Sequence, residues 1–399
     1  MTATGRRLAV FIYDLSGGGA QRRTLTLAHA FAARGHQVDL VVVRPHGPLL
    51  QELSPLVRLV AYDRRWWLSW TALSQSDWTL ASIAVLANYL RRERPDVMLS
   101  GASHVNRAAL WARFLTRVPT KLVIRVSNHP SQSAVNARGR PQRLRLWQAR
   151  YLYPKADAII AVSRGVAEDV ARISGLPRER ITTIYNPVVT SELYEKMQAP
   201  LDHPWFTPGG LPVLVGMGKL KAQKDFPTLL RAFARVRAVR PARLLILGEG
   251  RKRRELEAVA RELGVTGDVA LPGFVLNPFP YLARASLFVL SSAWEGLPGV
   301  LVEALACGCP VVSTDCPSGP AEILDHGVYG PLVPVGDDAA LAQAILSMLD
   351  SPADPARLRA RAALFSVEQA VDRYLHVLLG GWNIREASEV SRQRKEQGV

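Results

Sequence analysis

Short apolar runs alternate with segments of helical periodicity along most of the chain. The run at 286–290 is short and apolar at nearly every position, as expected of a strand that is buried on both faces. Further strand candidates occur at 8–13, 38–43, 96–100, 121–126, 156–162, 181–185, 243–247 and 310–313. Because helical patterns separate these runs, the sequence predicts an α/β fold of doubly wound parallel sheets.

The first predicted crossover carries a glycine-rich loop. Gly17, Gly18 and Gly19 follow the strand at 8–13 and precede a helix whose apolar positions span 25–31. Glycines let a backbone approach a ligand closely, although tight turns use the same residues. The loop lacks the G-x-G-x-x-G spacing of dinucleotide-binding folds, so a dinucleotide site is not predicted.

Residues 291–324 hold the strongest candidate for a ligand site. Pro298 and Gly299 start a helix directly after a strand, at the edge where open parallel sheets bind ligands. Free backbone N–H groups at such a helix start attract phosphate. Glu295 and Glu303 flank this start, and carboxylates accept hydrogen bonds from sugar hydroxyls. The pattern indicates a sugar-nucleotide site. Alternatively, Glu303 only offsets the helix dipole and Glu295 is a surface loop acid.

The segment from Glu295 to Glu303, EGLPGVLVE, resembles the E-x7-E element of retaining glycosyltransferases of family 4. The resemblance implies the GT-B fold, in which two Rossmann-like doubly wound domains face each other across a cleft. It also implies an N-terminal acceptor-binding domain and a C-terminal nucleotide-sugar-binding domain. The predicted first domain spans 1–190, a linker spans 191–210, and the second domain spans 211–366. A C-terminal helix is predicted at 367–385, where it could pack back on the first domain, and a disordered tail at 386–399.

The resemblance assigns roles to individual residues. Glu295 would hold hydroxyls of the donor sugar, Glu303 would hold the ribose, and Lys219 and Lys224 would meet the donor diphosphate. Lys219 stands where the family has an arginine, so it keeps the charge and loses the bidentate fork; two solvated surface lysines are the alternative. His129 corresponds to a family histidine near the donor sugar, or is a solvated loop residue. The resemblance thus implies three sets of site residues. The donor-binding residues would be Gly18, Gly19, Lys219, Lys224, Val275, Glu295, Leu297, Pro298, Gly299, Val300, Leu301 and Glu303. The catalytic residues would be His129, Glu295 and Lys224, and the acceptor-binding residues would be Gly17, Asn106 and Asn128.

Positive charge is concentrated in the first half of the chain. Residues 1–200 carry 28 Lys and Arg against 13 Asp and Glu, which accounts for nearly all of the net charge of +16. Aromatic residues are interleaved with arginine at 64–78 and 138–155. Aromatic rings favour the headgroup layer of a membrane, and each basic residue gains about 1 kcal/mol near anionic lipid. This predicts peripheral contact with the inner face of the cell membrane and a polyprenyl-diphosphate-linked acceptor. Tryptophans in the core and solvated arginines are the alternative, and no RNA-binding motif supports a nucleic-acid partner.

Composition limits the class of protein. A hydrophobic content of 48% with 21% charged residues fits a soluble globular protein, and 399 residues favour two domains. No apolar stretch reaches the roughly 18 residues that span a bilayer, and the run at 8–13 is too short for a signal peptide. These features predict a cytoplasmic protein. Cys307, Cys309 and Cys316 lack the number and spacing of a zinc site and are interpreted as reduced packing residues.

The resemblance, together with these features, implies a retaining, metal-independent glycosyltransferase that moves a hexose or N-acetylhexosamine from a UDP-sugar to a lipid-linked or oligosaccharide acceptor. No Asp-x-Asp pair occurs in the chain, so a metal on the diphosphate is not indicated, and no cofactor is expected. In this family a leaving phosphate oxygen is thought to take the acceptor proton, so no strong protein base is required. The alternatives are a nucleotide-sugar 2-epimerase on the same fold, or a basic nucleic-acid- or lipid-binding protein with a vestigial site.

Overall fold

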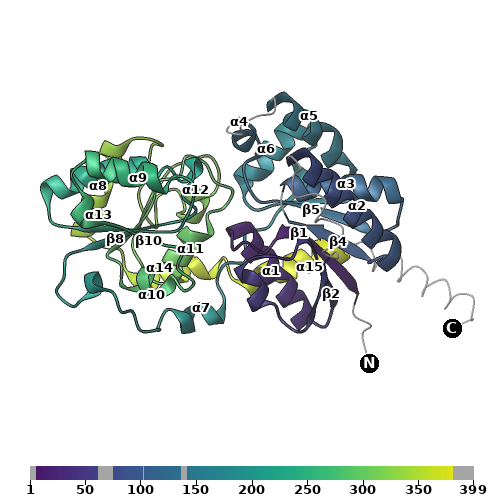
Figure 1. Ribbon diagram of the computed structural model, residues 1–399, viewed down its shortest axis with the longest axis horizontal. Helices are drawn as coiled ribbons and strands as arrows, with labels where there is room; N and C mark the ends of the chain where they lie inside the picture. The colour runs from purple at the N-terminus through teal and green to yellow at the C-terminus, as the bar shows by residue number, and fades with distance from the viewer. Residues whose placement is uncertain (1–5, 62–74, 102, 136–141, 381–399) are drawn as a thin grey trace, which may run out of the picture.

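The protein consists of two α/β domains, each built on a parallel sheet with helices on both faces (Figure 1). A computed structural model describes residues 6–61, 75–101, 103–135 and 142–380, without the side chains of 75–79, 103–104 and 142–145. The arginine- and tryptophan-rich segment at 64–78 and the predicted tail at 386–399 therefore lie outside the described residues and side chains.

The first domain contains a seven-stranded sheet in the order β3-β2-β1-β4-β5-β6-β7, counted over the described residues, with every neighbouring pair parallel. Its strands are β1 (Arg7–Asp14), β2 (Gln37–Arg44), β3 (Val57–Ala61), β4 (Val97–Ser100), β5 (Lys121–Val126), β6 (Ala158–Ala161) and β7 (Ile181–Thr183). Its helices are α1 (Gly19–Ala33), α2 (Gln75–Glu93), α3 (Ser103–Thr116), α4 (Pro130–Val135), α5 (Gln142–Leu152) and α6 (Arg164–Ser174).

The second domain contains a six-stranded parallel sheet in the order β10-β9-β8-β11-β12-β13. Its strands are β8 (Val213–Met217), β9 (Arg243–Leu247), β10 (Val269–Gly273), β11 (Leu287–Leu290), β12 (Val311–Thr314) and β13 (Leu332–Val333). The helices after the first domain are α7 (Ser191–Lys196), α8 (Phe226–Val239), α9 (Arg253–Glu262), α10 (Phe279–Arg284), α11 (Gly299–Ala306), α12 (Pro320–Ile323), α13 (Asp338–Asp350), α14 (Pro355–Ala363) and α15 (Val367–Leu379).

The apolar strands are explained by packing on both faces of each sheet. In β1, Leu8 and Val10 belong to the apolar cluster that includes residues of α1 and α15. The alternate residues Ala9 and Phe11 belong to the cluster that includes residues of α2 and α3. Because successive side chains of a strand point to opposite faces, a strand covered on both sides has to be apolar at every position. The predicted fold class is confirmed.

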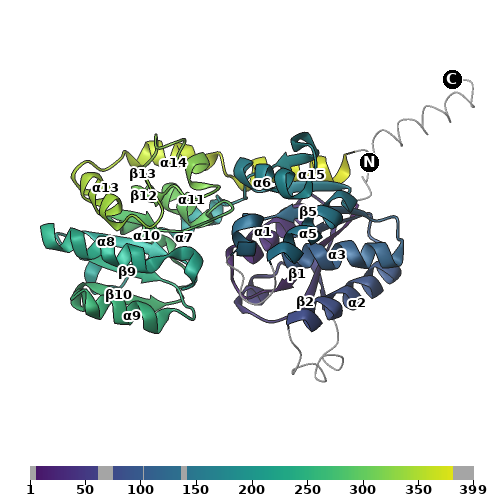
Figure 2. The same cartoon turned by 90° about the horizontal axis from the view of Figure 1, so that it is seen from above.

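The last described helix, α15, returns to the first domain, as its yellow ribbon beside α1 shows (Figures 1 and 2). Tyr374 is fully buried, and its ring centroid lies 6.5 Å from that of Phe31 on α1. Lys121 Nζ donates to the carbonyls of Val377 and Gly380, each at 2.7 Å. The chain therefore crosses between the domains twice, once before β8 and once before α15.

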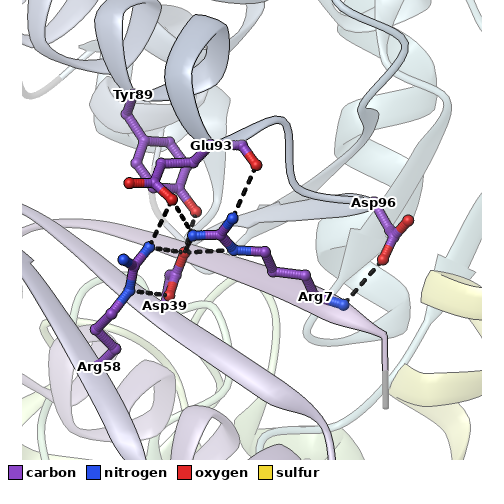
Figure 3. A network of polar contacts seen from close by, with 6 residues as sticks. All are labelled: Arg7, Asp39, Arg58, Tyr89, Glu93 and Asp96. Carbon is purple, nitrogen blue, oxygen red and sulfur yellow. Dashed lines mark hydrogen bonds and ion pairs between the residues drawn. The ribbon is translucent and has the colours of Figure 1, made fainter. Parts of the chain in front are cut away.

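A polar network joins the first three strands of the first sheet to α2 (Figure 3). Asp39 on β2 is buried and accepts hydrogen bonds from Arg58 Nε at 2.7 Å and from the Tyr89 hydroxyl at 2.7 Å. Arg7, the first residue of β1, pairs with Asp39 at 3.1 Å and with Glu93. Since Arg7 begins β1, the network lies toward the amino ends of the strands, away from the edge where parallel sheets bind ligands. It is a structural cluster.

The order of each sheet reverses at a central strand. β1 lies between β2 and β4, and β8 lies between β9 and β11. Open α/β sheets bind ligands at the carboxyl ends of the strands beside such a reversal. The loops that follow β1, β8 and β11 are therefore the positions at which a site is expected, and they contain the glycine loop, Lys219 with Lys224, and Glu295.

Candidate functional site

The loops that were predicted to form the site meet between the two domains. A Cβ atom built on Gly18 of the glycine loop would lie 3.4 Å from Lys219 Nζ of the second domain. A Cβ on Gly17 would lie 3.9 Å from the ring of Phe274. The glycine loop of the first domain therefore faces the loops after β8 and β10. Gly19, the first residue of α1, has no atom within 4 Å of the position that its Cβ would take.

Glu295 is the center of a buried polar cluster in the second domain. Its Oε1 accepts from Lys224 Nζ at 2.7 Å and from Ser292 Oγ at 2.9 Å, and Gln223 Nε2 lies 3.2 Å from its Oε2. The side chains of Glu295 and Lys224 are 10% and 11% exposed. Burial lowers the pKa of the nearby Lys221, and Glu295 opposes that effect. A carboxylate held by three donors is oriented rigidly, which suits the recognition of hydroxyl groups.

Glu303 has a different partner, which comes from the other domain. Its Oε1 accepts from the guanidinium of Arg23 on α1, and the two side chains are 9% and 8% exposed. Burial lowers the pKa of Arg23 below its usual value, and the charge of Glu303 offsets only part of that effect. The two glutamates of the E-x7-E segment are thus both buried and both paired with a cation, one within the second domain and one across the domain boundary.

The N-terminus of α11 lies between the two glutamates in the sequence. Pro298 precedes Gly299, the first residue of the helix, and Val300 follows in the first turn. The first N–H groups of a helix have no partner within the helix, so they are available to an anion. Leu297 and Leu301 are buried in the apolar core, so they anchor this end of α11 and do not line an open surface. This end of α11 was predicted correctly as a helix start.

First-domain side chains hold the backbone of the E-x7-E segment. Ser163 Oγ donates to the Gly296 carbonyl at 2.8 Å, and Asn186 Nδ2 donates to the Leu297 carbonyl at 3.0 Å. A Cβ on Gly296 would lie 2.4 Å from the carbonyl oxygen of Ser127, so the loop after β5 requires glycine here. These contacts bring Ser127 and Asn128 against Gly296, the residue that follows Glu295.

His129 lies at the start of α4 and is oriented by Asp169 of α6. Its Nδ1 is 3.0 Å from Asp169 Oδ2, and that carboxylate also accepts from Ser131 N at 2.8 Å. A backbone N–H of Gln132 lies 3.5 Å from the same Nδ1, but the shorter contact with a carboxylate is the stronger one. Burial alone raises the pKa of Asp169, and hydrogen bonds from His129 and Ser131 bring it below the usual range. Asp169 therefore fixes the ring of His129 with Nδ1 as the donor.

Within the described part of the chain, three of the predicted site residues form no hydrogen bond with Glu295, Glu303 or their cationic partners. The side chain of Asn106 is fully buried inside the first domain, where its Nδ2 donates to the Arg125 carbonyl at 2.9 Å. The Asn128 side chain accepts from the backbone N–H of His129 at 3.0 Å. Val275 follows β10 and is half-buried. The structure brings Asn128 beside the site and leaves Asn106 within the core.

Several residues of the site were not predicted from the sequence. Arg23 was missed although it lies on the apolar stripe of α1, four residues before Leu27, where a charge is unusual. Nothing in the sequence pointed to Asp169, because only the fold brings α6 next to His129.

The three cysteines are buried packing residues. Cys307, Cys309 and Cys316 are free and buried, and burial raises the pKa of the Cys307 thiol to about 12. Among the described residues, no three His, Cys, Asp or Glu side chains gather closely enough to share a metal ion.

The fold is similar to that of solved glycosyltransferases. Anabaena HepE in complex with UDP and glucose matches with a TM-score of 0.76 and 20% sequence identity, and the match covers 94% of this chain and 99% of HepE. At that identity the likeness concerns the fold. Two parallel-sheet domains with facing loops at the carboxyl ends of their strands define the GT-B class.

Sequence comparison identifies the family. Residues 17–192 match Glycosyltransferase Family 4, and residues 211–351 match Glycosyl transferases group 1. The lipopolysaccharide core biosynthesis glycosyltransferase LpsE of Rhizobium meliloti is 30% identical over 90% of this chain and 96% of LpsE. The N-acetylgalactosamine-N,N'-diacetylbacillosaminyl-diphospho-undecaprenol 4-alpha-N-acetylgalactosaminyltransferase of Campylobacter jejuni is 27% identical over 94% of this chain and all of its own length. The chain belongs to glycosyltransferase family 4 and is a glycosyltransferase.

Proposed function

We propose that the protein transfers a hexose or N-acetylhexosamine from a nucleotide sugar, with a UDP-sugar as the first choice, to a lipid-linked or oligosaccharide acceptor in glycan assembly. The observation that carries the proposal is the position of Glu295 and Glu303 on either side of the α11 N-terminus, with Lys224 on Glu295 and Lys219 opposite the glycine loop. In this proposal Glu295 accepts hydrogen bonds from hydroxyls of the donor sugar, and Glu303 accepts them from the ribose.

The reaction breaks the bond between the anomeric carbon and a phosphate oxygen and forms a bond from that carbon to an acceptor oxygen. The leaving diphosphate gains negative charge, which Lys219, Lys224 and the α11 N-terminus would stabilise. The acceptor proton passes to the leaving phosphate oxygen, so no protein base has to remove it. His129, held by Asp169, would orient the donor sugar from the first-domain side. Retention at the anomeric carbon and independence of metal are parts of the proposal.

The lipid-linked acceptor is supported by a surface of the first domain and by the names of relatives. The Campylobacter relative is named for a diphospho-undecaprenol substrate, and LpsE for lipopolysaccharide core biosynthesis. We define the aromatic–basic face as Trp111 and Phe114 of α3, Trp147 and Tyr151 of α5, and Lys155. The four aromatic residues are between 41% and 57% exposed, and Lys155, in the turn after α5, has its Nζ 5.0 Å from the Phe114 ring centroid on α3.

The stretch of sequence that contains most of this face is strongly basic. Residues 101–150 include ten Arg and Lys and no Asp or Glu, although Arg125 is buried and Arg113 pairs with Asp157. Tyr153, which was grouped with the interfacial aromatics from the sequence, is 4% exposed and belongs to the core. Within the described ranges, every helix is too short or too polar to cross a bilayer. We therefore propose that the protein contacts the membrane surface through the aromatic–basic face.

The experiment that tests the proposal measures sugar transfer directly. Wild-type protein and Glu295→Ala are incubated with UDP-, GDP- and ADP-sugars and a short polyprenyl-diphosphate-linked saccharide, and products are identified by mass spectrometry. We expect transfer from a UDP-sugar by the wild type and loss of transfer by the variant. NMR of the product reports the anomeric configuration, and an inverted product would refute retention. A new nucleotide sugar formed without any acceptor would favour the 2-epimerase.

A further inference from the structure

The partner of Glu303 raises a question about donor binding. Arg23 is nine-tenths buried, its guanidinium also lies 3.4 Å from the carbonyl oxygens of Pro187 and Val188, and it reaches Glu303 from the other domain. The proposed function requires Glu303 to bind the ribose. Unlike the donors that hold Glu295, which belong to its own domain, Arg23 reaches this carboxylate from the other domain and packs against Gly299 at the start of α11.

The guanidinium also lies where a phosphate is expected. A Cβ on Gly299 would lie 3.0 Å from Nη2 and 3.3 Å from Nε of Arg23, so the guanidinium packs against the first residue of α11. The N-terminus of a helix carries a partial positive charge, which disfavours a cation and favours an anion at this position. Among the described contacts of Arg23, Glu303, one turn into the helix, is the only carboxylate that neutralises the charge of the guanidinium.

A second buried arginine makes the need for an anion stronger. Arg125 is 1% exposed, its Nη2 is 2.5 Å from Asn186 Oδ1, and its Nε has no hydrogen-bond partner among the described residues. None of its described contacts is with a carboxylate, and its charge acts on Arg23. Arg125 is next to the domain boundary, because Asn186, which accepts from it, also donates to the Leu297 carbonyl of the second domain. Glu303 is thus one carboxylate for two buried positive charges, Arg23 and Arg125. A dianionic ligand would balance these charges.

We propose that Arg23 exchanges partners when the donor binds, leaving Glu303 and binding the donor diphosphate. This deepens the proposed function and rests on it. The exchange is consistent with the energetics of buried groups, because a guanidinium that loses its only carboxylate has to find another acceptor. The diphosphate provides paired oxygens in the geometry that the guanidinium fork prefers. Arg23 is then a donor-binding residue from the first domain, and ribose binding and diphosphate binding are coupled through it.

The exchange makes a prediction that a merely structural ion pair does not. In Arg23→Gln, Glu303 is free for the ribose while one phosphate ligand is missing. We expect the affinity for UDP, measured by calorimetry, to fall about tenfold or more, and the affinity for uridine to stay the same or rise. Arg22→Gln is the matched control, because Arg22 is the adjacent residue of α1 and pairs with Glu52 at 3.2 Å on the surface. It should change neither affinity.

The outcomes separate this inference from the proposed function. Equal losses for UDP and uridine in Arg23→Gln, or no loss for either, would overturn the exchange while leaving a nucleotide-binding wild type intact. A wild type that binds none of UDP, GDP and ADP would overturn both. If GDP or ADP binds best, the matching nucleoside replaces uridine. If Arg23→Gln does not fold, Arg23→Lys carries the test, since it keeps the charge and loses the fork. An unchanged ratio of UDP to uridine affinity in Arg23→Lys would refute the inference.

Discussion

Glu295 and Glu303 have the same side chain and different environments. Lys224, Ser292 and Gln223 hold the carboxylate of Glu295 from within its own domain, whereas first-domain side chains reach only the backbone of the segment that follows it. Glu303 is held by Arg23 of the first domain, so its state depends on contact between the domains. A rigid carboxylate suits the reacting sugar, and one whose partner can exchange suits a group that signals donor occupancy.

Replacement of Glu295 by glutamine tests the first of these roles. Glu295→Gln keeps the size of the side chain, but the amide is a weaker acceptor and leaves Lys224 without a carboxylate. We expect kcat/KM for transfer to fall by about 100-fold or more, and the melting temperature to fall as well, because the buried Lys224 loses its carboxylate. Glu257→Gln on α9, a half-exposed acid that pairs with Arg253, is the control and should retain full activity. Retention of activity by Glu295→Gln would contradict its assignment to the donor sugar.

The cations of the site lead to a second prediction at this scale. In the proposed function, Lys219 and Lys224, together with Arg23, would supply the positive charge that a divalent ion provides to a diphosphate in metal-dependent enzymes. We therefore expect EDTA to leave the transfer rate unchanged and added Mg²⁺ or Mn²⁺ not to raise it. A loss of activity in EDTA that Mg²⁺ or Mn²⁺ restores would show that the lysines alone do not balance the leaving group.

The individual residues of the site differ in how well the sequence predicts them. Glu295, Lys219 and Lys224 follow apolar strands and Glu303 lies in the helix that begins there, so the sequence places all four where open sheets bind ligands. The roles of the two lysines came from the resemblance to family 4. Arg23 and Asp169 depend on which helices become neighbours in space, and a sequence does not state this. Asn106 follows a strand in the same way as a site residue, yet its helix turns the side chain into the core.

At the scale of elements, the network around Asp39 ties β1, β2, β3 and α2 together. Burial alone raises the pKa of Asp39, but hydrogen bonds from Arg58 and Tyr89 and the charge of Arg7 bring it below the usual carboxyl range. A carboxyl whose pKa is lower in the folded state contributes stability above its unfolded pKa. That contribution is lost as the pH falls through the lower, folded pKa.

Replacement of Asp39 should therefore affect stability in a pH-dependent way. We expect Asp39→Asn to lower the free energy of unfolding by about 2 kcal/mol at pH 7, and the difference from the wild type to shrink below about pH 4. Urea titrations at pH 7 and pH 3 measure both values. Asp372→Asn, which removes an exposed acid paired with Arg34, should change stability little. A difference that is independent of pH would refute the role of the Asp39 charge.

Most long elements were predicted from their patterns, and the short or polar ones were not. β1, β5 and β9 agree with the predicted ranges to within about two residues at each end. β13 has only two residues, and β3 has an arginine in its second position, so neither has the apolar run of a buried strand. α14 alternates alanine and arginine and shows little periodicity in sequence. These elements form because neighbouring elements complete their hydrogen bonds and packing.

At the scale of the whole molecule, the charge asymmetry leads to a prediction about membranes. The aromatic–basic face belongs to the positively charged first half of the chain. We expect the protein to float with vesicles that contain phosphatidylglycerol and to stay in solution with phosphatidylcholine vesicles, because each basic residue near anionic lipid contributes about 1 kcal/mol. Trp147→Ser with Tyr151→Ser should weaken flotation several-fold.

The control and the contrary result are both available in the same assay. Val239→Ser changes an exposed apolar residue at the end of α8 in the second domain and should leave flotation unchanged. If wild-type protein fails to bind anionic vesicles at low salt, the aromatic–basic face does not contact lipid. An equal loss in both variants would also rule out a specific role for α5.

The packing of α15 against the first domain has a consequence for folding of the nascent chain. The ribosome makes α1 early, but the tyrosine that covers Phe31 emerges only after the entire second domain, roughly tens of seconds later. Until then, the apolar side chains of β1 and α1 that α15 covers remain exposed. A chain that stalls before α15 would leave its first domain unfinished, so translation speed and chaperone supply should limit the yield of this enzyme more than its final stability does.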